Sequence, residues 1–456
     1  MQARSGNSSR RPKRAALHTL GCRLNQSESA ALRRSLENAG YEIVPWGAEA
    51  ELCVLNSCTV TARSDAKSRQ ALRSIRRRYP QARLALLGCY AQTQGEQVAG
   101  LGLADLILGN AQKMNLTGYL ERGQAEAGGA PLVVTPRISR QPFVLDTFAA
   151  VDGKTRASLK IQDGCDFMCS FCIIPTARGR ARVRRLANLM EEAHSLAEAG
   201  VREVVLTGVN LGTYQEDGVN LVDVVDGLNS IPGLARIRIS SIEPTTVDEG
   251  LLERMADTAH RLVPYLHLPL QSGNDGILRA MRRRYGAVEY RRFAGDALRR
   301  VPHLCLGTDV MVGFPGEDGA AFQDTHDLLA DLPLAYCHVF PYSERKGTPA
   351  ARMLERVDAG IRQRRVALLL ALSQEKQLAF QRRAQGGVRR VLFEQGKNAG
   401  MARGLTENFI RVEVPCTAPG ALRNRILPVQ LLRPGTEVMG GELVEPIPEL
   451  VANGTG

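Results

Sequence analysis

The sequence predicts an α/β protein with three structural regions: a βαβ domain with a parallel sheet, a partial (β/α)6 barrel and a small C-terminal β-barrel. Apolar strand-like segments alternate with helical segments at residues 15–125 and again at 151–383. Such alternation is typical of parallel sheets. In residues 384–447, short strand patterns with glycine turns replace it, which favours a small barrel.

In the first region, apolar strand patterns enclose two helical patterns. The strand patterns cover 15–22, 51–58, 82–89 and 103–110, and the helical ones cover 27–40 and 62–78. Three of the strands end in a cysteine: Cys22, Cys58 and Cys89. Because the carboxyl ends of parallel strands form the functional edge of an open sheet, we expect these thiols to meet. The alternative is that they are ordinary buried strand cysteines, but their position at strand–loop junctions favours a metal cluster with three cysteine ligands.

The second region contains six strand patterns, most of them separated by helical patterns. They cover 157–162, 203–210, 236–244, 265–273, 305–316 and 336–343. Six β/α repeats predict a partial barrel, because a complete one has eight. Chemistry in such barrels gathers at the carboxyl ends of the strands. Polar residues stand at those ends here: Asn210, Ser241, Glu243, Gln271, Asp309, Tyr342 and Ser343.

A single segment at 160–180 holds Cys165, Cys169 and Cys172 in a C-x3-C-x2-C spacing. Three thiols this close on one loop can converge on one face of an iron–sulfur cube and leave its fourth iron without a protein ligand. An open iron is what a cluster needs to bind and activate a small molecule. A zinc site usually has four ligands in two pairs, and no fourth Cys or His stands nearby. We therefore interpret the segment as a cluster-binding loop.

Composition points to a nucleic-acid-binding protein of the cytoplasm. The chain has 456 residues, a formal net charge of +12 and ten cysteines. The positive charge predicts a polyanionic partner. Cysteines in a chain whose N-terminus lacks an apolar secretory segment predict metal ligation rather than disulfides. No apolar run approaches the roughly 20 residues that cross a membrane, so no membrane partner is expected. The remaining segments predict a disordered basic arm at 1–14, a linker at 126–150 and a tail at 448–456.

The chain resembles the radical S-adenosylmethionine (SAM) methylthiotransferase family over about residues 15–445, and within it the enzymes that act on threonylcarbamoyladenosine in tRNA. The motifs that carry the resemblance are TLGCRLNQSE, NSCTVT, GCYAQ, IQDGCDFMCSFCIIPTARG, LTGVNLGTY, RISSIEP, LHLPLQSG, TDVMVGFPGE and HVFPYSERKGT. The resemblance implies an N-terminal cluster domain, a radical SAM core and a C-terminal RNA-binding TRAM domain. Two small departures are Phe167-Met168 between the first two core cysteines and Ser27 where the family often has an aromatic residue.

Carried over by position, the resemblance implies two 4Fe–4S clusters and SAM as cofactors. An auxiliary cluster would be bound by Cys22, Cys58 and Cys89, and the SAM-cleaving cluster by Cys165, Cys169 and Cys172. Five residues lie where the core of the family usually contacts SAM: Gly208, Asn210, Ser241, Glu243 and Gln271. Each of these five could instead be a strand-end polar residue that satisfies loop backbone groups.

The implied activity is methylthiolation of carbon 2 of N6-threonylcarbamoyladenosine at position 37, in the anticodon loop of tRNA. SAM would be both radical source and methyl donor, and the auxiliary cluster would supply sulfur. An external electron donor is expected, because the sequence has no flavin or Rossmann fingerprint. Isopentenyladenosine in tRNA and an aspartate of a ribosomal protein are alternative substrates. A non-catalytic iron–sulfur RNA-binding redox sensor is the alternative from another class, and it would leave the polar strand-end residues without a purpose.

Basic segments are candidates for contact with RNA phosphates. They are residues 63–83, 178–185 and 279–300 and the C-terminal barrel, although each helical run could instead be a solvated face. Phe409 and Arg411 could face RNA, and Phe409 could equally belong to the core. The other cysteines lack cluster spacing and are interpreted as structural: Cys53, Cys305, Cys337 and Cys416. His267 and His338 lie in strand patterns and are interpreted as core or rim residues rather than ligands.

Overall fold

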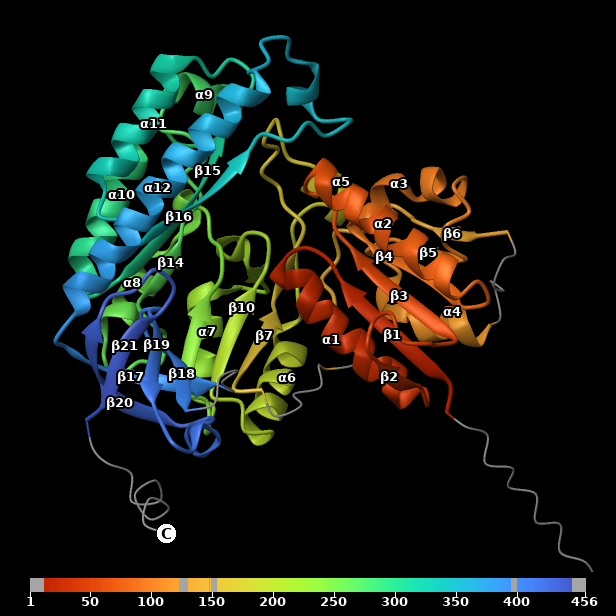
Figure 1. Ribbon diagram of the computed structural model, residues 1–456, viewed down its shortest axis with the longest axis horizontal. Helices are drawn as coiled ribbons and strands as arrows, with labels where there is room; N and C mark the ends of the chain where they lie inside the picture. Colours follow the sequence, from red (N-terminus) through yellow and green to blue (C-terminus); the bar gives the residue numbers. More distant parts are fainter. Residues whose placement is uncertain (1–11, 123–129, 147, 149–153, 395–399, 445–456) are drawn as a thin grey trace, which may run out of the picture. The chain divides into compact units, whose positions relative to one another are not determined.

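The computed structural model forms two compact units (Figure 1). The described residues are 12–122, 130–146, 148, 154–394 and 400–444. The first unit comprises residues 1–140, 145–150 and 173–180, and the second comprises 141–144, 151–172 and 181–456. The predicted tail at 448–456 and most of the predicted arm at 1–14 lie outside the described residues.

The first unit is built on a six-stranded parallel sheet of order β2-β1-β3-β4-β5-β6. Its strands are β1 (Arg14–Thr19), β2 (Glu42–Val44), β3 (Leu52–Ser57), β4 (Arg83–Gly88), β5 (Leu106–Leu108) and β6 (Leu132–Val134). Its helices are α1 (Arg23–Asn38), α2 (Ala62–Arg78), α3 (Cys89–Ala99), α4 (Leu116–Glu121) and α5 (Ile174–Arg178). Leu32 of α1 packs with Val54 on one face of the sheet, and Leu72 of α2 packs with Leu55 on the other. Because helices cover both faces, β3 is buried at every residue.

Two parts of this unit differ from the sequence prediction. Residues 132–134, inside the predicted linker, form the edge strand β6, which pairs in parallel with β5. Three consecutive apolar residues are too few for a periodicity to be read from the sequence. Helix α5 belongs to the first unit, although it directly follows the cysteine loop of the second. It is held there partly because Asn110 donates a hydrogen bond of 2.6 Å to the carbonyl oxygen of Ala177.

The second unit contains the predicted partial barrel of six parallel strands. They are β7 (Arg156–Lys160), β10 (Glu203–Thr207), β13 (Arg236–Ile239), β14 (Tyr265–His267), β15 (Cys305–Val312) and β16 (Tyr336–Pro341). The main helices are α6 (Leu186–Glu198), α7 (Leu221–Asn229), α8 (Glu249–Ala256), α10 (Ala287–Arg300), α11 (Gly319–Asp331) and α12 (Ala359–Ala384). A bridge between Ile237 and Leu262 connects the two three-stranded halves. Smaller elements are β8 (Gln162–Asp163), β9 (Arg182–Val183), α9 (Asp275–Ala280) and the 3-10 turn η4 (Pro349–Arg352).

The C-terminal strands close into a five-stranded barrel of order β17-β18-β19-β21-β20, as the sequence predicts. Its strands are β17 (Val388–Glu394), β18 (Met401–Thr406), β19 (Arg411–Pro415), β20 (Ile426–Arg433) and β21 (Met439–Leu443). This barrel is part of the second unit and packs against the amino ends of the core strands. Arg236, the first residue of β13, donates to the carbonyl oxygen of Leu405 at 2.8 Å. Arg156, the first residue of β7, donates to Glu394 at 2.7 Å.

Among the described helices, none is both long and apolar enough to span a lipid bilayer.

Candidate active site

The core cysteines, Cys165, Cys169 and Cys172, lie on a loop that directly follows β8. Ser170 anchors the middle of this loop. Its hydroxyl donates to the carbonyl oxygen of Ala280 at 2.7 Å, and its own carbonyl oxygen accepts from the amide of Ala350 at 2.8 Å. The loop is thereby fixed to the end of α9 and to η4, so that its three thiols are held by structure outside the loop.

The three core cysteines differ in their exposure to solvent. Cys165 and Cys169 are buried and Cys172 is half-buried. The pKa of Cys165 is raised to about 11, mainly by burial and also by the nearby Cys169, against a hydrogen bond from the amide of Phe167. Burial therefore favours the protonated form of Cys165, and a bound metal centre would have to displace that proton.

Arg283 connects the cysteine loop to the carboxyl edge of the barrel. Its guanidinium donates to Sγ of Cys169 at 3.3 Å and forms a two-armed ion pair with Glu243. It also donates to the hydroxyl of Tyr285, which in turn bonds to the carbonyl oxygen of Leu270. Arg283 lies within the basic run that the sequence offered to RNA phosphates, but its side chain is 2% exposed. It is an internal group of the site.

The five predicted SAM contacts lie at the carboxyl ends of three neighbouring strands. Gly208 and Asn210 follow β10, Ser241 and Glu243 follow β13, and Gln271 follows β14. An added Cβ on Gly208 would lie 2.9 Å from Oε1 of Gln162, so glycine is required for this close approach. That same Oε1 accepts from the backbone amide of Asn210 at 3.1 Å.

Asn210 and Glu243 are brought together, because Oδ1 of Asn210 accepts from the amide of Glu243 at 3.2 Å. Gln271 has a left-handed backbone (φ 73°), with its amide bonded to the carbonyl oxygen of Asp309 at 2.8 Å. Ser241 contributes a backbone contact, since its carbonyl oxygen accepts from Leu211 at 3.5 Å. Glu243 is held mainly by Arg283, and burial raises its pKa in spite of that cation.

Buried polar atoms at this edge have no partner among the described residues. They are Nδ2 of Asn210, Oγ of Ser240 and the hydroxyl of Tyr342. They follow β10, β13 and β16, respectively. A buried donor without a partner costs about 1–3 kcal/mol. Unsatisfied groups at one end of a barrel therefore fit a site that is completed by a polar ligand.

The N-terminal cysteines, Cys22, Cys58 and Cys89, stand at the carboxyl ends of β1, β3 and β4, three adjacent strands of one sheet. Burial raises the pKa of Cys58, and the neighbouring Cys89 and Cys22 add to the rise, so the thiols lie close enough to interact. Gly21 makes this approach possible. A Cβ there would lie 2.6 Å from Cβ of Cys58, and its φ of 102° is one that other residues rarely adopt.

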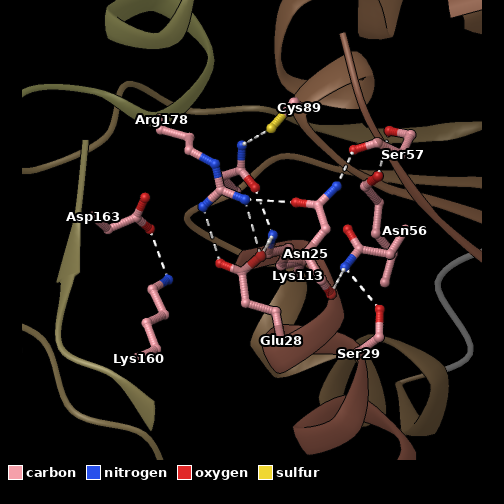
Figure 2. Close-up of polar contacts among 12 residues, drawn as sticks. Asn25, Glu28, Ser29, Asn56, Ser57, Cys89, Lys113, Lys160, Asp163 and Arg178 are labelled. Atoms are coloured by element: carbon pink, nitrogen blue, oxygen red, sulfur yellow. Dashed lines mark hydrogen bonds and ion pairs between the residues drawn. The ribbon is translucent and has the colours of Figure 1, made fainter. Parts of the chain in front are cut away.

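A buried polar network lies beside Cys89 (Figure 2). Nδ2 of Asn110 donates to Sγ of Cys89 at 3.4 Å, and its Oδ1 accepts from Nζ of Lys113 at 2.7 Å. Lys113 also pairs with Glu28, and Arg178 donates to both carboxylate oxygens of Glu28 at 3.1 Å. All three charged side chains are 1% exposed. The lysine therefore orients the amide that points at the sulfur.

Most arginines of the 279–300 run are exposed, namely Arg279, Arg282, Arg284, Arg291, Arg292 and Arg299, whereas part of the 178–185 run is internal. Arg178 and Arg184, which the sequence analysis offered as phosphate contacts, are almost completely buried. Arg184 pairs with Glu192, and Arg182 contacts Asp163 at 3.2 Å. By contrast, α2 presents exposed basic side chains: Arg63, Lys67, Arg73, Arg77 and Arg78. The ring of Phe409 packs against that of Tyr265 in a tilted arrangement, with the centroids 4.7 Å apart, and so belongs to the interface between the core and the C-terminal barrel, whereas Arg411 is exposed.

The sequence reasoning missed Asn110, Lys113 and Arg283. Asn110 could have been found, because it ends a strand pattern in the same way as the three cysteines do. Arg283 gave no such signal, since it stands in a run of arginines whose members face different ways. The four remaining cysteines are buried, as expected for structural residues.

Comparison with known proteins identifies the family. Residues 14–109 match the model of uncharacterized protein family UPF0004, and residues 159–329 match that of the Radical SAM superfamily. The threonylcarbamoyladenosine tRNA methylthiotransferase MtaB of Bacillus subtilis is 35% identical over 439 residues, which cover 94% of this chain and 96% of that protein. The chain belongs to the radical SAM tRNA methylthiotransferases. The MtaB of Aquifex aeolicus is 37% identical over 88% of this chain and 96% of its own length.

A relative with another substrate in its name is also similar to this methylthiotransferase. The tRNA-2-methylthio-N(6)-dimethylallyladenosine synthase of Cereibacter sphaeroides is 34% identical over 94% of this chain and 98% of that protein. Among solved structures, the radical SAM methyltransferase TsrM of Kitasatospora setae shares the fold, with a TM-score of 0.54, 16% identity and coverage of 75% of this chain and 77% of that one. OxsB, a cobalamin-dependent radical SAM enzyme, gives a TM-score of 0.53 at 12% identity and covers 75% of this chain and 54% of that one.

As a radical SAM methylthiotransferase, the protein is an enzyme whose cofactors are SAM and two 4Fe–4S clusters. The described residues fit these groups. Each of two sites offers three cysteines, two of which are buried, and a hydrogen-bond donor to one sulfur. Its substrate is a tRNA. The alternative of a non-catalytic RNA-binding redox sensor finds no support among these relatives.

Proposed function

We propose that the protein methylthiolates carbon 2 of N6-threonylcarbamoyladenosine at position 37, in the anticodon loop of tRNA. The presence of two three-cysteine sites carries this proposal, because each leaves one iron of a four-iron cluster open for further chemistry. The choice of nucleoside is supported by the names of the relatives from Bacillus subtilis and Aquifex aeolicus, which match the chain over most of its length.

In this proposal the core cysteines bind the cluster that holds SAM, and the N-terminal cysteines bind the auxiliary cluster. When bound, the clusters and SAM supply the electron transfer, the sulfur and the methyl group that an unactivated C–H bond requires and side chains cannot provide. The protein's own residues would bind and orient these groups and shield them from water. Arg283 donates to Sγ of Cys169, and Asn110 donates to Sγ of Cys89. Hydrogen bonds to cluster sulfurs tune the reduction potential.

SAM contacts are proposed for Gly208, Asn210, Ser241, Glu243 and Gln271. Nδ2 of Asn210 is buried and has no partner among the described residues, so it suits an acceptor on the cofactor. Glu243 is already paired with Arg283, and it would act by orienting that guanidinium as well as by accepting from a ligand. Gly208 has no side chain to fill the space beside Gln162, so this part of the site stays open.

The RNA would be held by charge on exposed elements of each unit. Helix α2 offers a row of exposed basic side chains, and Arg411 is exposed on the C-terminal barrel. Contacts of this kind hold the RNA backbone, whereas the unpaired loop base is recognised by stacking and base-edge hydrogen bonds. An external electron donor completes the list of proposed partners.

The second candidate substrate is isopentenyladenosine in tRNA. It is favoured by the synthase from Cereibacter sphaeroides, whose name refers to dimethylallyladenosine. The test is a competition between two anticodon stem-loops that differ only in the modification at position 37. We expect the cluster-loaded enzyme to convert the threonylcarbamoyl RNA to its methylthio form, detected by nucleoside mass spectrometry. Conversion of the isopentenyl RNA alone would refute the proposed substrate.

The assignment of the N-terminal cysteines has its own test. Cys89→Ala should lower the iron content from about eight to about four atoms per chain, because one cluster of four irons is lost. It should still release 5′-deoxyadenosine from SAM but form no methylthio product. Cys53→Ala is the matched control, a buried cysteine in the same sheet, and should keep all three properties. Methylthiolation by Cys89→Ala would rule out its role as a ligand.

A further inference from the structure

The two faces of β16 have different surroundings. The backbone amide of Cys337 donates to Oγ of Ser373 in α12 at 3.0 Å, and Val339 packs against the hydrophobic core of the partial barrel. Alternate residues of a strand point to opposite sides. His338 and Phe340 therefore lie on the face turned away from the helices, where their exposed fractions are 57% and 46%.

His338 is held in one orientation in spite of this exposure. It stands opposite Asp309 in the register of β15 and β16, and its Nδ1 lies 3.1 Å from Oδ1 of that carboxylate. Nε2 of His267 lies 2.9 Å from the same oxygen. Hydrogen bonds from His267 and His338 lower the pKa of Asp309 although burial opposes this, so the carboxylate is ionised and accepts from both rings.

The support for this arrangement extends along the same face. Nδ1 of His267 bonds to the hydroxyl of Tyr336 at 3.0 Å, and Tyr336 bonds to the hydroxyl of Tyr265 at 2.7 Å. Gly307 leaves the space that the ring of Tyr336 fills, because a Cβ there would lie 2.1 Å from that ring. His267 thus has both nitrogens engaged. In His338, Nδ1 contacts Asp309, and within the described residues no hydrogen bond involves Nε2.

Nε2 of His338 is therefore a fixed and accessible group with a buried counter-ion behind it. In its protonated form the ring presents an Nε2–H, which is a charged donor suited to an anionic acceptor. The threonylcarbamoyl side chain ends in a carboxylate, whereas an isopentenyl side chain is entirely apolar. A donor at Nε2 of His338 would therefore distinguish these two candidates for the substrate.

We propose that His338 binds the carboxylate of the threonylcarbamoyl group and selects this nucleoside over an isopentenyl one. The assignment rests on the proposed function. It extends that function by naming the residue that recognises the modification. This residue stands between Tyr336 and Phe340 on the same face of β16.

A metal ion is the competing explanation for this cluster. The ligand atoms of His267, Asp309 and His338 all lie within 4.8 Å of one another. The two N···O separations of 2.9 and 3.1 Å are nevertheless those of ordinary hydrogen bonds, and the bonds satisfy Asp309 without an ion. Direct binding through His338 is therefore the simpler account.

The test compares two RNA ligands. One stem-loop carries threonylcarbamoyladenosine at position 37, and the other carries the same group with its carboxylate converted to a carboxamide. Equilibrium binding is measured with cluster-loaded enzyme. Wild type should bind the carboxylate RNA about tenfold to a hundredfold more tightly, which is the range for a hydrogen bond to a charged group. His338→Leu should bind both RNAs with the wild-type affinity for the carboxamide.

The matched control is His326→Leu. His326 also pairs with a neighbouring aspartate, Asp327, at 3.3 Å, but it lies on the surface helix α11. This variant should keep the full preference for the carboxylate.

The possible failures are separable. If wild type converts only isopentenyl RNA, the proposed function fails and this inference fails with it. If wild type converts threonylcarbamoyl RNA but His338→Leu keeps the carboxylate preference, the inference alone is wrong. Metal analysis supplies the last arm: about one non-iron metal per chain in wild type, lost in His338→Leu, would overturn direct binding. Absence of such a metal from both proteins supports direct binding through His338.

Discussion

Glu28 neutralises two buried cations at once, and this makes its removal more damaging than removal of either cation. In Glu28→Gln, Arg178 and Lys113 lose the carboxylate that both contact. Breaking a buried ion pair by removing one partner costs about 3–5 kcal/mol. In Arg178→Met, the pair between Glu28 and Lys113 persists. The cost is then that of the lost hydrogen bonds to a charged group, about 1.5–3 kcal/mol.

These costs convert to melting temperatures that can be measured. A domain of about 150–250 residues loses about 2–4 °C for each kcal/mol. Glu28→Gln should therefore lower the melting temperature of the first unit by about 6–20 °C. This is roughly twice the effect expected for Arg178→Met. Circular dichroism melts of the full chain, recorded anaerobically, provide the assay.

The control for Glu28→Gln lies on the same helix. Glu37 forms an exposed pair with Arg33 at 3.1 Å, one helical turn apart. Such pairs contribute about 0.3–0.5 kcal/mol, so Glu37→Gln should shift the melt by less than about 2 °C. If Arg178→Met destabilises the protein as much as Glu28→Gln, the charge-balance reasoning is refuted.

Three further predictions concern separate parts of the molecule. Gly21→Ala should abolish iron binding at the N-terminal cysteines, because its Cβ would overlap Cys58; full iron content in this variant would contradict the close approach. Asn110→Leu should make the potential of the auxiliary cluster more negative, since the donor to Cys89 is lost, and an unchanged potential in an EPR-monitored redox titration would exclude this role. Glu203 is fully buried, which raises its pKa, but Arg238 and two further arginines lower it below the usual value. A carboxylate whose pKa is lower in the folded than in the unfolded protein stabilises the fold at pH values above the unfolded pKa of about 4.3. This stabilisation is lost as the pH falls from that value through the folded pKa. Urea unfolding between about pH 6 and 3 should therefore show a steeper loss of stability in wild type than in Glu203→Gln, and parallel curves would disprove it.

Much of the fold was accessible from the sequence because the relevant patterns are local. The alternation of apolar and helical segments predicted the six strands of the partial barrel, and the predicted helix at 62–78 coincides with α2. The strand-end rule predicted that Cys22, Cys58 and Cys89 meet at one edge of the sheet, and they stand at the carboxyl ends of three adjacent strands. Strand β6 escaped prediction, since its stability comes from pairing with β5 rather than from its own sequence.

The charged residues of the sites were harder to predict, because the partner of a charge is set by tertiary structure. Arg178, Arg184 and Arg283 looked like RNA contacts in runs of positive charge, yet each pairs with a glutamate inside the protein. Those glutamates are distant in sequence from Arg178 and Arg283. Net charge therefore overstated the cationic surface that is available to RNA.

The docking of the C-terminal barrel at the amino ends of the core strands determines which part of an RNA it can touch. The chemistry lies at the opposite ends, and a strand of six residues spans about 20 Å. A base held at the carboxyl edge is thus separated by roughly that length from the barrel. If the protein acts as proposed, the barrel would contact the paired stem, because helical RNA is recognised through its shape and phosphates rather than its base sequence. The barrel would then bind the form that tRNA stems share, and residues at the carboxyl ends of the core strands would select the nucleoside.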